Sequence, residues 1–132
     1  MLIVGEILIL SAHLLCMNVA SGAPLVGIWL EWRARRGDGL SGQMARYMAA
    51  AAVLAFVAGS GLGVALGWLL WTPGYARLWQ GPLSYKLHWG LIELAFSLVL
   101  LIVVWLWSKT ASGSRGWLGR SLLGLLASTN LL

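Results

Sequence analysis

The sequence predicts an all-α protein: a polytopic bundle of transmembrane helices, with three full spans, a fourth partial or truncated span, and the N-terminus outside. Composition supports this class, because 60% of the 132 residues are hydrophobic, 10% are charged and nine are tryptophan. Apolar runs cover residues 2–32, 43–71, 85–107 and 117–132, and about 20 apolar residues are enough to cross a bilayer. We therefore expect one transmembrane helical domain over residues 1–132.

The first span, residues 2–32, holds a titratable imidazole inside an otherwise apolar run. Its only charged or imidazole side chains are Glu6, His13 and Glu31. No basic residue precedes the run, and it exceeds the length of about 7–15 apolar residues of a secretory signal. We therefore expect a permanent span, which ends at the arginines that precede the polar link Gly37-Asp38-Gly39.

The second span, residues 43–71, has small residues at its middle. Every fourth position carries one, which places them on one helix face: Ala51, Ala55, Gly59, Gly63 and Gly67. Such a face lets another helix, or a flat cofactor, approach the backbone closely. Both interpretations stay open at this point.

The third span, residues 85–107, carries His88 and Glu93 and follows a connection at 72–83 whose Pro and Gly residues suit a membrane interface. The fourth apolar segment, from Trp117, reaches about 16 residues before Leu132 and is shorter than a usual span. We therefore expect a partial span, or a sequence that is a fragment of a longer chain.

Orientation follows from the basic residues of the links. Seven of them fall on one side: Arg33, Arg35, Arg36, Arg46, Lys109, Arg115 and Arg120. Arg77 and Lys86 fall on the other side, so the positive-inside rule predicts cytoplasmic basic links in the cell inner membrane. The net charge of +5 then reflects topology and anionic headgroups; nucleic acid is not an expected partner.

The two histidines lie at matched predicted depth. His13 precedes Arg33 by 20 residues, and His88 precedes Lys109 by 21, so both are about 30 Å from the cytoplasmic edge at 1.5 Å per residue. Two imidazoles at one level on separate helices are what a haem b held between helices requires. The alternatives are a helix–helix hydrogen bond for His13 and an interfacial position for His88.

Glu93 lies five residues past His88 and about 7 Å deeper along the helix. A carboxyl group at that depth is either a proton carrier or a protonated group that bonds helices together. We assign it as a candidate proton carrier and keep the second interpretation open.

Several of these residues resemble one family. The run Ser11-Ala12-His13-Leu14-Leu15, with Gly22, Pro24 and Glu31 after it, resembles the first helix of the large subunit of bd-type quinol oxidases. Gly59 and Gly63 resemble the glycine pair of its second helix, and the stretch from Gly81-Pro82-Leu83 to Glu93 resembles the segment before its proton-path glutamate. The resemblance implies that His13 is an axial ligand of haem near the outer face.

The chain also departs from that family. It has Tyr85 and Lys86 where the family has a second acidic residue. The family's other haem ligands and its quinol-binding loop come later in its sequence than these 132 residues reach. A bd-like relative with altered chemistry fits this pattern better than a complete oxidase.

Two classes of function follow. The first is a haem b-binding electron-transfer subunit, as a component of a quinol-linked oxidoreductase. In this class His13 ligates iron, His88 is the candidate second ligand, and Gly59 and Gly63 flank the cofactor. Quinol, other membrane subunits or a periplasmic electron-transfer protein are its candidate partners.

The second class is a non-redox anchoring, assembly or transporter subunit whose histidines only bond helices. Motifs of soluble enzymes, such as a nucleotide-binding loop or HExxH, are absent from the sequence. An absorbance spectrum of the purified protein separates the two classes, because only the first contains haem.

Overall fold

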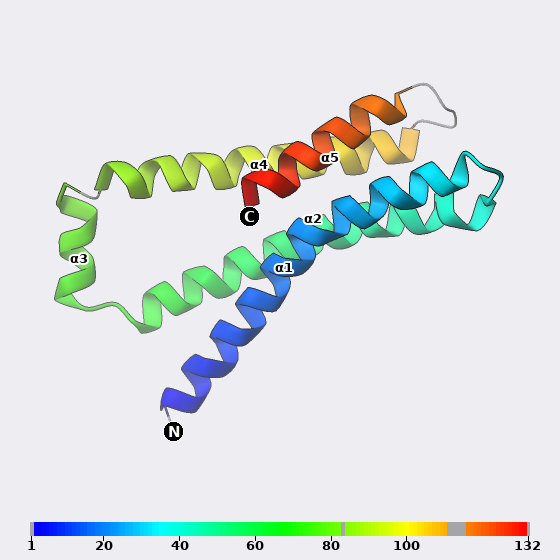
Figure 1. Cartoon of the computed structure of the whole chain (residues 1–132). Helices are drawn as coiled ribbons and strands as arrows, with labels where there is room; N and C mark the ends of the chain where they lie inside the picture. Colours follow the sequence, from blue (N-terminus) through cyan, green and yellow to red (C-terminus); the bar gives the residue numbers. More distant parts are fainter. Residues whose placement is uncertain (1, 83, 111–115, 132) are drawn as a thin grey trace.

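The computed structural model describes residues 2–82, 84–110 and 116–131, and its elements there are all helices. In chain order they are α1 (Leu2–Ala34), α2 (Gly39–Leu69), α3 (Pro73–Gln80), α4 (Ser84–Thr110) and α5 (Trp117–Leu131) (Figure 1). Helices α1, α2 and α4 are long and apolar enough to cross a membrane. Helix α5 has 15 residues, about 22 Å of helix, which is less than the hydrocarbon thickness. The predicted all-α class is confirmed, with three helices able to span a membrane. The partial or truncated fourth span and the side on which the N-terminus lies stay predictions.

The helices form two antiparallel pairs. Helices α1 and α2 pack along much of their lengths, α4 packs against α5, and the pairs meet where α5 contacts α1 and α2 contacts α4. In Figure 1, α2 and α4 diverge toward α3, which joins their far ends. We call the end of the bundle that holds the α1–α2 link and the start of α5 the close-packed end. At the opposite end, α2 and α4 lie apart.

The predicted polar link between α1 and α2 is a tight turn, and Asp38 caps the helix that follows it. Gly37 has φ +103°, a left-handed conformation that glycine adopts without a Cβ clash. Asp38 caps α2, because its carboxylate accepts hydrogen bonds from the Ser41 hydroxyl at 2.7 Å and the Ser41 amide at 3.4 Å. The Ser41 hydroxyl bond, together with the nearby Arg33, holds the pKa of Asp38 below its ordinary value of 3.8.

The connection between α2 and α4 contains a helix that the sequence did not lead us to expect. Pro73 occupies the first position of α3, where its missing N–H costs no hydrogen bond and its fixed φ suits a helix. The Ala76 amide donates to the Thr72 carbonyl at 3.1 Å, which starts the turn. Proline and glycine here begin and end a short helix, and do not mark an irregular loop.

The core consists mainly of small side chains, with three large ones between them. Its buried members are Ala20, Ala23, Ala52, Phe56, Leu100, Leu101 and Ala127. Small residues let helix backbones approach closely, which is how apolar helices gain packing energy in lipid. Helices α4 and α5 also pack closely at a small residue, because a Cβ at Gly119 would lie 2.9 Å from the Trp107 ring.

Basic residues of the described chain gather at the close-packed end, where the charge count places them together; Arg115, which belongs to the same predicted group, lies outside the described residues. The α1–α2 link and the start of α5 lie together there, since the Arg35 guanidinium lies 4.7 Å from the Trp117 ring centroid. Arg36 lies 3.7 Å over Trp32, and Lys109 lies 3.8 Å over Trp105. Such pairs of a cation and an aromatic ring are typical of a membrane interface.

Candidate functional site

His13 joins α1 to α2 through a hydrogen bond. Its Nδ1 lies 2.7 Å from the carbonyl oxygen of Gly59. A carbonyl oxygen only accepts, so Nδ1 must carry the proton that is donated. In the neutral ring Nε2 is then the atom with a free lone pair, which is the form of histidine that ligates metals.

Gly59 and Gly63 make this approach of α1 possible. A Cβ at Gly59 would lie 2.9 Å from the Met17 sulfur and 3.1 Å from Cys16 Cβ, and a Cβ at Gly63 would lie 3.0 Å from His13 Cε1. Atoms do not pack at such distances, so a larger residue at either position would displace α1. Close helix packing, one of the two interpretations of the small-residue face, is confirmed at these two glycines.

A groove lies beside His13, between α1, α2 and α4. Its volume is about 670 Å³, within the range of about 300–1,000 Å³ of small-molecule and cofactor sites. Its lining is almost entirely apolar: His13, Met17, Phe56, Ser60, Gly63, Val64, Gly67, Trp68, Trp71, Leu91, Leu94, Ala95 and Leu98. We call it the His13 groove. Figure 1 shows α2 and α4 diverging toward α3.

His13 is the only imidazole among the residues that line the His13 groove, and Ser60 adds a hydroxyl. The Ser60 Oγ atom is buried and has no hydrogen-bond partner among the described atoms. Across the described chain, no three His, Cys, Asp or Glu side chains cluster as a metal site would require. The groove lining thus offers one imidazole and one aliphatic hydroxyl as polar groups, beside the indole rings of Trp68 and Trp71.

His88 and Glu93 lie elsewhere on α4 and do not line the His13 groove. Nδ1 of His88 lies 2.6 Å from the carbonyl oxygen of Ser84, one turn back on the same exposed face. The Glu93 side chain is exposed, and its backbone carbonyl accepts a hydrogen bond from Asn130 at 3.0 Å. The structure thus brings His13 and Gly63 to the groove and places Gly59 behind the imidazole. The roles predicted for His88 and Glu93 stay predictions.

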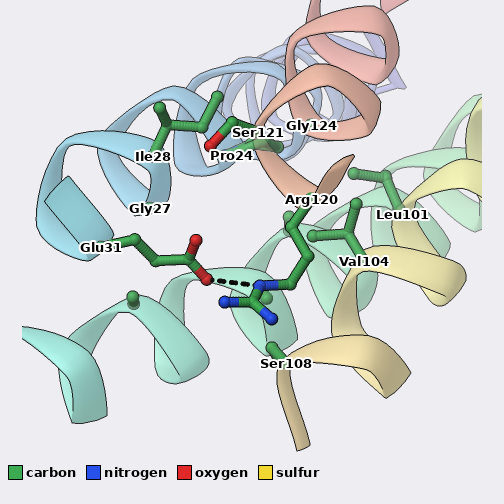
Figure 2. Close-up of a pocket in the computed structure, with 13 residues that line it drawn as sticks. Pro24, Gly27, Ile28, Glu31, Leu101, Val104, Ser108, Arg120, Ser121 and Gly124 are labelled. Atoms are coloured by element: carbon green, nitrogen blue, oxygen red, sulfur yellow. Dashed lines mark hydrogen bonds and ion pairs between the residues drawn. The ribbon is translucent and has the colours of Figure 1, made fainter. Parts of the chain in front are cut away.

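A second site, which is polar, lies near the close-packed end (Figure 2). Nε of Arg120, from α5, donates to Oε1 of Glu31, from α1, at 2.9 Å. The two side chains are only 9% and 19% exposed, so this ion pair is largely removed from solvent. It fixes the start of α5 against the end of α1.

The ion pair borders a small cavity between α1, α2, α4 and α5. The cavity measures about 20 Å³ and is lined by Ser121 as well as the two charged residues, room for about one water molecule. Oε2 of Glu31, Nη1 of Arg120 and Oγ of Ser121 are buried without a partner among the described atoms. Charged atoms in this position make the pair sensitive to the loss of either member.

The sequence analysis used Arg120 only as one of the basic residues that predict membrane orientation, and Glu31 only as part of the family resemblance. Both lie at the predicted cytoplasmic ends of apolar runs, and opposite charges at one membrane depth tend to pair. That rule indicates from the sequence that each charge needs a partner of opposite sign at this depth, but it does not select which residues pair. The lining aromatic residues of the His13 groove, Phe56, Trp68 and Trp71, carried no comparable signal.

Fold and sites define a multi-pass helical membrane protein with an apolar, imidazole-bearing groove. No family model, curated protein or solved structure matches the chain in comparisons with each.

Proposed function

We propose that this chain is a haem b-binding membrane protein that transfers electrons, with His13 as an axial ligand in the His13 groove. The observation that carries the proposal is the 2.7 Å bond between Nδ1 of His13 and the Gly59 carbonyl. That bond selects the tautomer with Nε2 free, and it holds the ring in one orientation, as hydrogen bonds to metal-bound histidines generally do. The resemblance of the first span to the bd-type oxidase subunit supports the same assignment.

The groove suits a flat, mostly apolar cofactor. Gly63 and Gly67 present backbone without side chains on the α2 wall, and Leu91, Leu94 and Leu98 supply an apolar wall on α4. Such walls exclude water and lower the local dielectric, which influences the reduction potential of a bound iron centre. Haem b, when bound, supplies a one-electron couple.

We infer a single protein ligand for the iron from the residues that line the groove. Met17 also lines the groove, but it follows His13 by one turn on the same helix, so the two side chains approach from the same side. His13 is thus the residue of the groove lining that would hold the iron. A quinol, another membrane subunit or a periplasmic electron-transfer protein then serves as the partner for electrons in the inner membrane.

One other function has an observation in its favour. The His13–Gly59 bond joins two helices, which is all that a non-redox anchoring, assembly or transporter subunit needs from this histidine. In that case the groove holds lipid, and no variant at His13 changes an absorbance spectrum.

The test is the haem content of purified wild-type protein and of matched variants. We expect b-type bands in the reduced-minus-oxidised spectrum of the wild type, at about one haem per chain. His13→Gln should remove the bands, because an amide does not ligate haem iron. Glutamine is chosen since its amide can still donate to the Gly59 carbonyl. His88→Ala should retain them, because His88 does not line the groove.

Circular dichroism and size-exclusion profiles of His13→Gln show whether the bundle is intact. A folded His13→Gln protein that keeps its haem would refute the ligand assignment. Wild-type protein that binds no haem, even after incubation with hemin, would refute the proposed function and leave the helix-bonding role of His13.

A further inference from the structure

A second groove lies between α2 and α4, at the close-packed end of the bundle and separate from the His13 groove. Its volume is about 440 Å³. Its lining is polar and aromatic: Gln43, Arg46, Tyr47, Ala50, Trp105, Ser108 and Lys109. We call it the basic groove.

The basic groove carries two positive charges from two different helices. Arg46 lies in the second turn of α2 and Lys109 in the last turn of α4, and both are exposed. No acidic residue lines the groove. The Lys109 ammonium lies 3.8 Å from the Trp105 ring centroid, a contact that orients the cation without neutralising it.

The acidic groups at this end of the described chain are already engaged. Glu31 pairs with Arg120 at 2.9 Å, and Asp38 pairs with Arg33 at 3.2 Å. Among the described residues Arg46 has no ion-pair partner. Two cations that face one groove repel each other, and an anion from outside the chain would relieve that repulsion.

Position in the membrane indicates which anion. Arg46 lies in the second turn of α2 and Lys109 in the last turn of α4, and both helices are long and apolar enough to span a membrane. The positive-inside rule predicts that these helix ends lie near the cytoplasmic headgroups. Basic pockets between transmembrane helices on the cytoplasmic side characteristically bind anionic headgroups. Gln43 and Tyr47 add an amide and a hydroxyl that can donate to phosphate oxygens.

We propose that the basic groove is a binding site for the phosphate group of an anionic phospholipid, held by Arg46 and Lys109. Exposed apolar side chains deeper on the same two helices, such as Leu54 and Val103, are 70% and 38% exposed and offer surface for the acyl chains. The site does not depend on haem, and it adds a specific lipid to the general attraction of the basic links for the membrane.

The test is native mass spectrometry of delipidated protein titrated with phosphatidylglycerol, phosphatidylcholine or inorganic phosphate. We expect one phosphatidylglycerol to remain bound under conditions that remove phosphatidylcholine. Arg46→Gln or Lys109→Gln should each weaken this binding about five-fold, and the double variant about 25-fold. Arg46→Lys, which keeps the charge, should restore most of it.

Arg36→Gln is the matched control, because it removes one charge at the same end of the bundle from a residue that stacks on Trp32 and does not line the groove. It should leave the tightly bound phosphatidylglycerol unchanged. Equal losses in Arg36→Gln and Arg46→Gln would overturn the site in favour of a diffuse charge effect. Inorganic phosphate that binds as tightly as phosphatidylglycerol would overturn the lipid assignment.

Discussion

Replacing Glu31 with glutamine would leave the Arg120 guanidinium inside the bundle without its carboxylate. Arg120 is 8% exposed as a residue, and its Nη1 already lacks a partner among the described atoms. A guanidinium cannot discard its charge by losing a proton. We therefore expect Glu31→Gln to lower the free energy of unfolding by about 3–5 kcal/mol, as the loss of one member of a buried pair generally does.

The measurement is reversible unfolding in mixed micelles of increasing denaturing-detergent fraction, followed by circular dichroism. The matched control is Arg33→Gln, which breaks the more exposed Arg33–Asp38 pair, with side chains 49% and 38% exposed. Surface pairs of this kind contribute about 0–1 kcal/mol. The stability of Glu31→Gln should thus fall several times further than that of the control.

A double-mutant cycle separates the pair from its surroundings. The double variant Glu31→Gln/Arg120→Gln replaces both charges with amides that can bond each other, so its loss should be smaller than the sum of the single losses by about 0.5–3 kcal/mol. Additive losses, or a loss for Glu31→Gln no greater than for Arg33→Gln, would refute the view that this ion pair holds α5 against α1.

Three further predictions concern helix contacts. Gly63→Val should displace the His13 ring, since a Cβ there would lie 3.0 Å from His13 Cε1. It should lower the free energy of unfolding by about 1–3 kcal/mol. The control in the same unfolding assay is Gly61→Val, because a Cβ at Gly61 meets nothing within 4 Å. Asn130→Ala should cost about 1 kcal/mol, because it removes the 2.6 Å bond to Ser97 Oγ and the bond to the Glu93 carbonyl; unchanged protease resistance of α5 would contradict this. Because the pKa of Asp38 is lowered in the folded protein, its cap stabilises α2 above pH 3.8, and this contribution is lost as the pH falls below that value. The melting temperatures of the wild type and of Asp38→Ala should therefore converge at acid pH. A difference that stays constant with pH would contradict the cap.

The sequence was sufficient to predict the membrane class, the three spans and the polar link at Gly37-Asp38-Gly39, because apolar length and glycine-rich turns are local properties. The four-residue spacing of small residues in α2 predicted close packing that the contacts at Gly59 and Gly63 confirm. The buried face of the helix, however, runs largely through residues outside that spacing, such as Ala45, Ala49 and Ala52. Helix α3 was missed because proline and glycine can either begin a helix or interrupt one.

Pairings between distant residues were harder to predict. Matched depth placed His13 and His88 at one membrane level, but depth says nothing about which way a side chain faces around its helix. The structure turns His13 toward α2 and leaves His88 bonded to its own helix. Arg120 likewise needed the packing of α5 on α1 before its role with Glu31 was visible.

The most direct test of the central claim is to replace the His13 side chain with free imidazole. His13→Gly opens space beside Gly59 and Gly63, and the reduced-minus-oxidised spectrum is then recorded with and without added imidazole. If Nε2 of His13 ligates haem, the variant should lack the b-type bands and regain them as imidazole is added. Bands that are present in His13→Gly without imidazole, or absent from the wild-type protein, would contradict the account.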